Sequence, residues 1–229
     1  MSKHIPISYS RIDTFKTCPK KFHEMNILKS VPFVQSDQMR QGEVIHKMLE
    51  DRLAEGKAFP KGYEYLEPIA ATIQKAPGQT HTELSLTFDR GLAQCGDRDW
   101  DRAWLRVRVD VAKLLGERAW AGDYKSGKRH FDELQLKICA AAMFQAFPDL
   151  ETVSTSFIWL QEKWMDDPTT YTRQDAAGIW SEIVDYSRQI EEANKTGQWP
   201  ARKNKFCAWC AVLKAGRCPE ALAWGVKPR

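Results

Sequence analysis

The chain has 229 residues, with 34 Lys and Arg against 30 Asp and Glu, and it contains six cysteines. This length suits one domain with a sizeable core, and the small positive excess allows a polyanionic partner without requiring one. No apolar run reaches about 18 residues and the first residues lack the apolar core of a signal peptide, so we expect a cytosolic protein with no membrane span.

The N-terminal part predicts helices. A capping-box pattern that begins at Ser10 predicts the start of the first helix. Residues 41–56 predict a second helix, with Val44, Met48 and Leu49 as the candidates for its inward face. Residues 62–76 predict a third, short helix.

After these helices the apolar period changes from helical to alternating. Alternation in 82–88 predicts a half-buried strand, and 104–125 predicts two strands around a tight turn at Gly116-Glu117. The remaining expected elements are a helix at 131–147, a strand at 152–160, a helix at 173–195 and an irregular tail from Trp199. This order predicts a mixed α/β core.

The hairpin around Gly116 predicts which residues face each other. A two-residue turn pairs Leu115 with Arg118, and the same register sets Asp110 opposite Asp123. Directly opposed residues have Cβ atoms about 4.5–5.5 Å apart, so the two carboxylates would repel each other. Strand alternation also puts Lys125 on the face of Asp123.

Two interpretations of this face remain open from the residues alone. A divalent cation would relieve the repulsion between Asp110 and Asp123, and Lys125 would then orient or deprotonate an attacking water beside a phosphate. The pattern therefore indicates half of a metal-dependent phosphodiester-cleaving site. The alternative is a solvent-facing ladder of ordinary charges.

Three of the cysteines cluster near the C-terminus. The spacing Cys207-x₂-Cys210-x₇-Cys218 is typical of thiolates that share one metal centre, but it is one ligand short of four. Two disulfides are the least favoured interpretation for a cytosolic chain. Cys95 and Cys139 are interpreted as free thiols without function.

Several ordered segments resemble the PD-(D/E)XK nuclease superfamily, and more narrowly its RecB-like branch, which includes the AddB nuclease domain, CRISPR-adaptation nucleases and phage exonucleases. The chain opens this likeness with "SYSRIDTFKTCPKKFH" and "GEVIHKMLE", and it continues with "RVD", "GDYKSGK" and "QLKICA". The resemblance implies a restriction-endonuclease-like core, with a mixed central β-sheet flanked by helices. It covers nearly the whole chain.

The resemblance also implies roles for individual residues. His46, Asp110 and Asp123 would coordinate Mg²⁺ or Mn²⁺, together with the backbone carbonyl of Tyr124. Lys125 would activate the attacking water. The resemblance further implies that Gln135 contacts the metal-bound water or the substrate backbone and that Glu83 is an auxiliary acid. Cys139 stands where the branch often has Tyr, which leaves the second half of that motif unmatched.

For the cysteines, the resemblance to the iron–sulfur subgroup implies that Cys18 joins Cys207, Cys210 and Cys218 around a [4Fe–4S] cluster. Zn²⁺ is the alternative. Residues 1–29 plus 199–229 would then form an iron–sulfur module that joins the N- and C-terminal segments. Residues 30–198 would be the catalytic core, within a single nuclease domain that spans 1–229.

The sequence therefore predicts a metal-dependent deoxyribonuclease, an exonuclease on single-stranded or frayed DNA ends in recombination, repair or phage replication. It would act in the cytoplasm or be phage-encoded and act in the host cytoplasm, with a recombination or replication protein as a further partner. Lys20, Lys21, Lys128 and Arg129 are predicted to contact DNA phosphates. The alternatives are a noncatalytic DNA-end-binding module and a zinc-stapled adaptor.

Overall fold

We describe a computed structural model that covers residues 4–127, 129 and 132–229. The chain divides into two compact units. The sheet unit comprises 35–183 and the cysteine unit comprises 1–34 and 184–229. In the sequence-based division, which stays a prediction, the corresponding boundaries fall after residue 29 and before residue 199.

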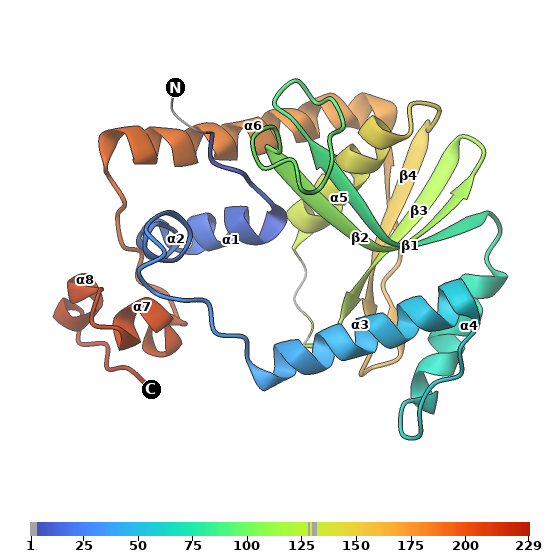
Figure 1. The fold of residues 1–229 in the computed structure, drawn as a ribbon, viewed down its shortest axis with the longest axis horizontal. Coiled ribbons are helices and arrows are strands. Elements are labelled where there is room, and N and C mark those ends of the chain that lie inside the picture. Colours follow the sequence, from blue (N-terminus) through green and yellow to red (C-terminus); the bar gives the residue numbers. More distant parts are fainter. Residues whose placement is uncertain (1–3, 128, 130–131) are drawn as a thin grey trace. The chain divides into compact units, whose positions relative to one another are not determined.

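The sheet unit is built on six strands (Figure 1). The path runs β1-β2-β3-β4-β5, and β6 pairs with β4. The β3–β4 pair is parallel and the other pairs are antiparallel, so the sheet is mixed. The strands are β1 (Gln79–Phe88), β2 (Leu105–Leu115), β3 (Arg118–Lys125), β4 (Thr152–Trp159), β5 (Trp164–Met165) and β6 (Thr169–Thr172).

Helices cover both faces of this sheet (Figure 1). On one face, α3 (Asp37–Glu55), the 3₁₀ turn η2 (Glu64–Leu66) and α4 (Glu67–Lys75) bury an apolar cluster. On the other face, α5 (Glu133–Ala146) packs Leu136 against Phe157 and Trp159 of β4. The predicted α/β architecture, a mixed sheet flanked by helices, is confirmed.

Local signals explain where the helices of the sheet unit begin and end. The Ser36 hydroxyl accepts a hydrogen bond from the Met39 N–H at 3.2 Å, and the chain leaves α3 through Gly56 at φ 72°. The Asp132 carboxylate caps α5 by accepting from the Leu134 N–H at 3.0 Å. The prediction that Val44 faces inward is wrong, because Val44 is 47% exposed and its neighbour Ile45 is buried.

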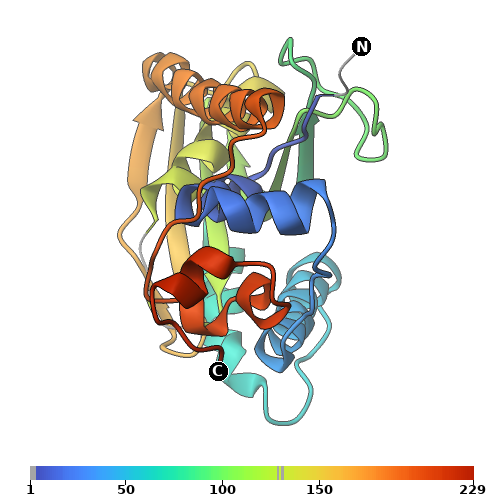
Figure 2. The ribbon, with the colours of Figure 1, turned by 90° about the vertical axis from the view of Figure 1, so that its left-hand side faces the viewer.

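The cysteine unit is assembled from short helices that are far apart in the sequence (Figure 2). Its N-terminal part holds α1 (Tyr9–Thr17), α2 (Pro19–Phe22) and the π-helical turn η1 (His23–Ile27). Its C-terminal part holds the end of α6 (Arg173–Thr196), the 3₁₀ turn η3 (Cys207–Trp209), α7 (Ala211–Lys214) and α8 (Pro219–Ala223). The tail is therefore partly helical, not irregular throughout as predicted.

The cap of α1 also differs from the prediction. Ser8, not Ser10, is the N-cap, and its hydroxyl accepts from the Arg11 N–H at 3.4 Å. Because Ser8 and Ser10 are two residues apart, both fit the same local pattern. None of the described helices combines the length and apolar character needed to cross a lipid bilayer.

Gly122, the first residue of "GDYKSGK", allows close packing within β3. A Cβ atom at this position would lie 2.6 Å from the Trp120 ring and 2.7 Å from Ile158 Cδ1. We expect Gly122→Ala to lower the free energy of unfolding by about 1–3 kcal/mol, because two packed side chains must move. The measurement is denaturant unfolding, with Gly178→Ala as control.

Gly178 is a matched control because a Cβ there meets no atom within 4 Å. It lies on the exposed side of α6, where Ala is a better helix former than Gly by about 1 kcal/mol. We therefore expect Gly178→Ala to be neutral or stabilising. A Gly122→Ala protein as stable as the wild type would contradict the packing argument.

Candidate active site

The predicted register of the hairpin is confirmed up to the last pair before the two aspartates. Leu115 pairs with Arg118 and Val111 pairs with Gly122. The ladder ends there, and Asp110 is not paired directly with Asp123. Instead, Asp110 Oδ2 accepts a hydrogen bond from the Tyr124 N–H at 2.7 Å.

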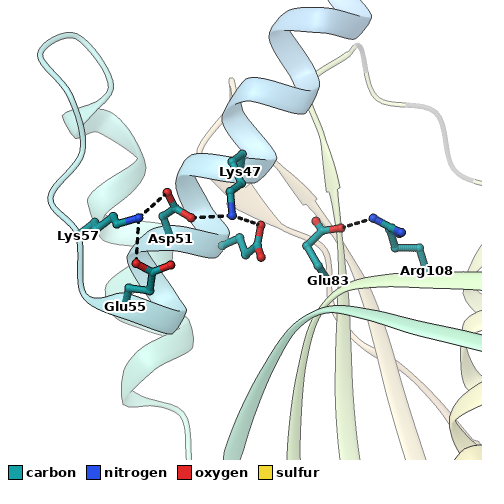
Figure 3. A network of polar contacts seen from close by, with 7 residues as sticks. Lys47, Asp51, Glu55, Lys57, Glu83 and Arg108 are labelled. Carbon is teal, nitrogen blue, oxygen red and sulfur yellow. Dashed lines mark hydrogen bonds and ion pairs between the residues drawn. The ribbon is translucent and has the colours of Figure 1, made fainter.

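Glu83 of β1 lies next to Asp110 in the sheet. Its neighbours pair as Thr82 with Val111 and Leu84 with Val109. Glu83 therefore lies opposite Asp110, although the two residues do not form a ladder pair. Glu83 has φ 48°, a left-handed conformation that is unfavourable for a residue with a side chain. Arg108 Nη1 lies 3.2 Å from Glu83 Oε2 (Figure 3). Strain of this kind persists where the surrounding structure fixes a functional geometry.

His46 reaches this group from α3. Its Nδ1 lies 3.6 Å from Asp110 Oδ1, and its ring meets the Tyr124 ring edge-on at 5.4 Å. One turn earlier, a Cβ on Gly42 would lie 2.9 Å from Ser126 Oγ. The absence of a side chain at Gly42 therefore lets α3 approach the end of β3.

A second group contains Asp123, Lys125 and Gln135. Lys125 Nζ lies 2.6 Å from Asp123 Oδ2 and donates to Gln135 Oε1 at 2.8 Å. Gln135 Nε2 donates to Asp123 Oδ1, which closes a triangle of side chains from β3 and α5. The Lys125 amine also lies 5.0 Å from the centre of the ring of Phe157, which belongs to the neighbouring strand β4. These contacts hold the amine in one orientation.

The acidic side chains of this region lie close together, and burial and neighbouring charges shift their pKa values. Burial raises the pKa of Asp123 to about 6, with Lys125 opposing the rise and Asp110 adding to it. Burial and the Asp110 charge raise the pKa of Glu83 in the same way. Burial favours neutral His46, but the hydrogen bond to Asp110 and the charges of Asp110, Asp123 and Glu83 raise its pKa overall.

The donor set fits a divalent cation. Among the described residues, one ligand atom each from His46, Glu83 and Asp110 lie within 4.8 Å of one another. Carboxylate oxygens are the ligands that Mg²⁺ and Mn²⁺ prefer, and imidazole is a common metal ligand in proteins. Asp123 is not in this group of described residues, and its carboxylate contacts Lys125 and Gln135. Glu83, the predicted auxiliary acid, is therefore better placed as a ligand than the sequence indicated.

Cys139 lies one helical turn after Gln135 on α5. Burial raises the pKa of its thiol, and the nearby charges of Asp123 and Asp110 add to the rise. The thiol is therefore protonated at neutral pH, and no nucleophilic role follows for it.

The cysteines predicted to bind iron and sulfur all lie in the cysteine unit. Cys18, Cys207, Cys210 and Cys218 line a single cavity of about 340 Å³, and none is in a disulfide. Two sulfurs accept backbone N–H groups, Cys207 from Asn204 at 3.3 Å and Cys18 from Arg202 at 3.5 Å. No three of these sulfurs lie within 4.8 Å of one another.

The residues predicted to contact DNA have different surroundings. Lys20 lies 3.7 Å from Glu220, and Lys21 lines the cysteine cavity. Arg129 pairs with Glu162 at 2.7 Å and lies 5.5 Å from the Trp164 ring centre. Lys128 is outside the described residues.

Two contacts of the site were not predicted from the sequence. The Tyr124 N–H binds Asp110, but a backbone donor leaves no signature in the residue types. Arg108 positions Glu83 through cross-strand pairing of Ser85 with Arg108, which requires the β1–β2 register. The signal for Arg108 would be its position two residues before Asp110 on the same face of the strand.

Comparisons with protein families and solved structures show what this chain is similar to. The sequence model of the PD-(D/E)XK nuclease superfamily matches residues 6–219. No curated protein is similar enough to match the chain. The solved structure of SSO0001 superposes with a TM-score of 0.46 and 13% identity, covering 93% of this chain and 87% of that one.

A second solved structure shares the fold more closely. A protein from Eubacterium rectale that carries the name "Putative exonuclease" superposes with a TM-score of 0.53 and 11% identity, covering 91% of this chain and 87% of that one. At this identity the likeness concerns the fold alone. Because the family match extends over nearly all of the sequence, this chain belongs to the PD-(D/E)XK nuclease superfamily.

Proposed function

We propose that this chain is a Mg²⁺- or Mn²⁺-dependent deoxyribonuclease, an exonuclease that acts on single-stranded or frayed DNA ends. The observation that carries the proposal is the Lys125–Asp123–Gln135 triangle beside the group formed by His46, Glu83 and Asp110. The name of the similar Eubacterium rectale structure supports cleavage from an end. We place the activity in the cytoplasm, in recombination, repair or phage replication.

Each residue has a chemical role in this proposal. His46, Asp110 and Asp123 would hold the cation with the carbonyl of Tyr124, and Glu83 would join them. Bound there, a divalent cation lowers the pKa of a coordinated water and stabilises negative charge on a phosphate oxygen.

The triangle supplies the proton chemistry. Lys125 would orient the attacking water and, in its neutral amine form, accept a proton from it, while Gln135 fixes the amine and the Asp123 carboxylate. The Phe157 ring next to the amine limits the side-chain orientations that Lys125 can adopt.

We propose also that the four cysteines of the cysteine unit bind a [4Fe–4S] cluster. A single tetrahedral Zn²⁺ with Zn–S bonds of about 2.3 Å would hold its sulfurs about 3.8 Å apart. The core of a [4Fe–4S] cluster is larger, with each thiolate on a different iron, and all four cysteines line one cavity of about 340 Å³. Such a cluster would join the N- and C-terminal segments of the unit.

The removal of the Lys125 amine tests the nuclease proposal. We expect Lys125→Ala to slow the cutting of end-labelled DNA by about 10³-fold with Mn²⁺ present, because proton transfer by a positioned group typically contributes about 10²–10⁴-fold. Binding of the same DNA in EDTA should be retained. Cleavage should be absent in EDTA for every variant and return with Mg²⁺ or Mn²⁺.

Lys75→Ala, which removes an exposed lysine at the end of α4, is the matched control and should cut at the wild-type rate. Products released one nucleotide at a time from the label would support exonuclease action on single-stranded or frayed ends. Undiminished cutting by Lys125→Ala would show that the assigned triangle does not perform the reaction.

A further inference from the structure

The two units of the chain carry opposite net charges. The sheet unit has 19 Lys and Arg against 24 Asp and Glu, a net charge of −5. The cysteine unit has 15 Lys and Arg against 6 Asp and Glu, a net charge of +9. The net charge of +4 for the whole chain conceals this separation. A DNA strand would be attracted to the cysteine unit and, apart from any bound cation, repelled by the unit with the active site.

Positive charge is concentrated in the C-terminal segment of the cysteine unit. Residues 199–229 contain seven basic side chains and one acidic side chain, Glu220. Glu220 lies 3.7 Å from Lys20 of the N-terminal part, so its charge is already balanced. All seven basic residues are exposed: Arg202, Lys203, Lys205, Lys214, Arg217, Lys227 and Arg229.

Exposed aromatic rings lie within this basic segment. Phe206 is 59% exposed and Trp209 is 55% exposed. Lys205 Nζ lies 5.1 Å from the Phe206 ring centre, and the Arg229 guanidinium lies 5.1 Å from that of Trp209. Both rings also line the rim of the cysteine cavity. A rim of exposed rings and cations is typical of surfaces that bind single-stranded nucleic acid.

Trp199 differs from these two rings, although the three share the same segment. It stacks on His23 at 4.8 Å and on Phe22 at 5.9 Å, and it meets Phe15 edge-on at 6.3 Å. Trp199 is half-buried and packs against the aromatic rings of its own unit. The exposure of Phe206 and Trp209 is not explained by the same packing.

We infer that the cysteine unit is the surface that holds the DNA strand, and that Phe206 and Trp209 stack on its unpaired bases. This inference rests on the proposed nuclease function and assigns strand binding to the unit without the catalytic residues. An acidic protein would match the charge of this surface but would offer no row of flat bases to the two rings. A single strand uses both features.

The test measures binding separately from cutting. A fluorescently labelled oligo(dT) is titrated with the protein in EDTA, so that no cleavage occurs, over a range of salt concentrations. We expect Lys203→Gln with Lys205→Gln to weaken binding at least fivefold and to reduce the salt slope by about 1.4, since each single-strand phosphate contact contributes about 0.7. Phe206→Ala with Trp209→Ala should weaken binding about tenfold with an unchanged salt slope.

The matched control is Lys61→Gln with Lys75→Gln, which removes the same charge from exposed positions of the sheet unit. It should bind oligo(dT) as the wild type does, and equal circular dichroism spectra would show that all variants are folded. Equal weakening by the control, or unchanged binding by both cysteine-unit variants, would overturn the inference. Wild-type protein that binds as expected but never cuts with Mn²⁺ would refute only the nuclease proposal.

Discussion

We expect Asp123→Asn to abolish cutting and at the same time to stabilise the cation-free protein. The buried Asp123 carboxylate has its pKa raised to about 6, chiefly by burial, while Lys125 opposes the rise and Asp110 adds to it. An uncharged amide removes the cost of burying this ion near Asp110. Each unit of pKa displacement corresponds to about 1.4 kcal/mol, so the rise from 3.8 to about 6 predicts a gain of about 3 kcal/mol at pH 7.5.

The pH dependence has a definite sign. Because the folded-state pKa of Asp123 lies above the value of 3.8 for an ordinary aspartate, its contribution to stability is fully present below pH 3.8 and is lost as the pH rises through about 6. The advantage of Asp123→Asn should therefore be largest above pH 6 and should shrink toward pH 4. Urea unfolding in EDTA at several pH values measures it.

Mn²⁺ should reverse this order of stability. The cation binds the folded wild type and raises its unfolding midpoint, whereas Asp123→Asn should respond weakly because one anionic ligand is gone. In cleavage assays we expect a loss of at least about 10³-fold for Asp123→Asn, the scale on which removal of a group that stabilises developing charge slows a reaction.

Asp149→Asn is the control for both measurements, since Asp149 is an exposed carboxylate in the turn after α5. It should change neither stability nor cutting. A cleaving Asp123→Asn enzyme, or one that is less stable than the wild type in EDTA at pH 7.5, would contradict the role assigned to this carboxylate.

The sequence predicted the site best where local geometry determines it. The two-residue turn at Gly116 determines the β2–β3 register, so the pairing of Leu115 with Arg118 follows from the length of the turn alone. The approach of β1 to Asp110 depends on the longer connection from Phe88 to Leu105. Its register, and hence the position of Glu83, could not be read from local spacing.

Elements that depend on tertiary contacts were missed for the same reason. The strands β5 and β6 have two and four residues, too few for an apolar period to appear in the sequence. Both exist because they pair with the buried strand β4. In the cysteine tail, α7 buries Val212 and Leu213 in a small apolar cluster with Cys218, which no local signal in a cysteine-rich segment predicted.

The loss of one proposed cluster ligand should affect stability more than any other single change. Cys210→Ser is expected to remove the brown colour and the broad absorbance near about 400 nm of anaerobically purified protein, because an iron–sulfur core needs its thiolates. A cluster that joins Cys18 to Cys207 closes a very long loop, so its loss should cost on the order of 5 kcal/mol. That is comparable to the whole stability of many domains.

Cys95→Ser is the matched control, since Cys95 lies in the sheet unit in the loop between β1 and β2 and does not line the cysteine cavity. It should keep the colour, the iron content and the unfolding midpoint of the wild type. Metal analysis decides between the two centres: about four irons per chain would establish the cluster, whereas a colourless protein with one zinc would favour the single ion. Chemical removal of the iron should then lower the stability of the wild type to that of Cys210→Ser, because both treatments delete the same link between Cys18 and the C-terminal cysteines.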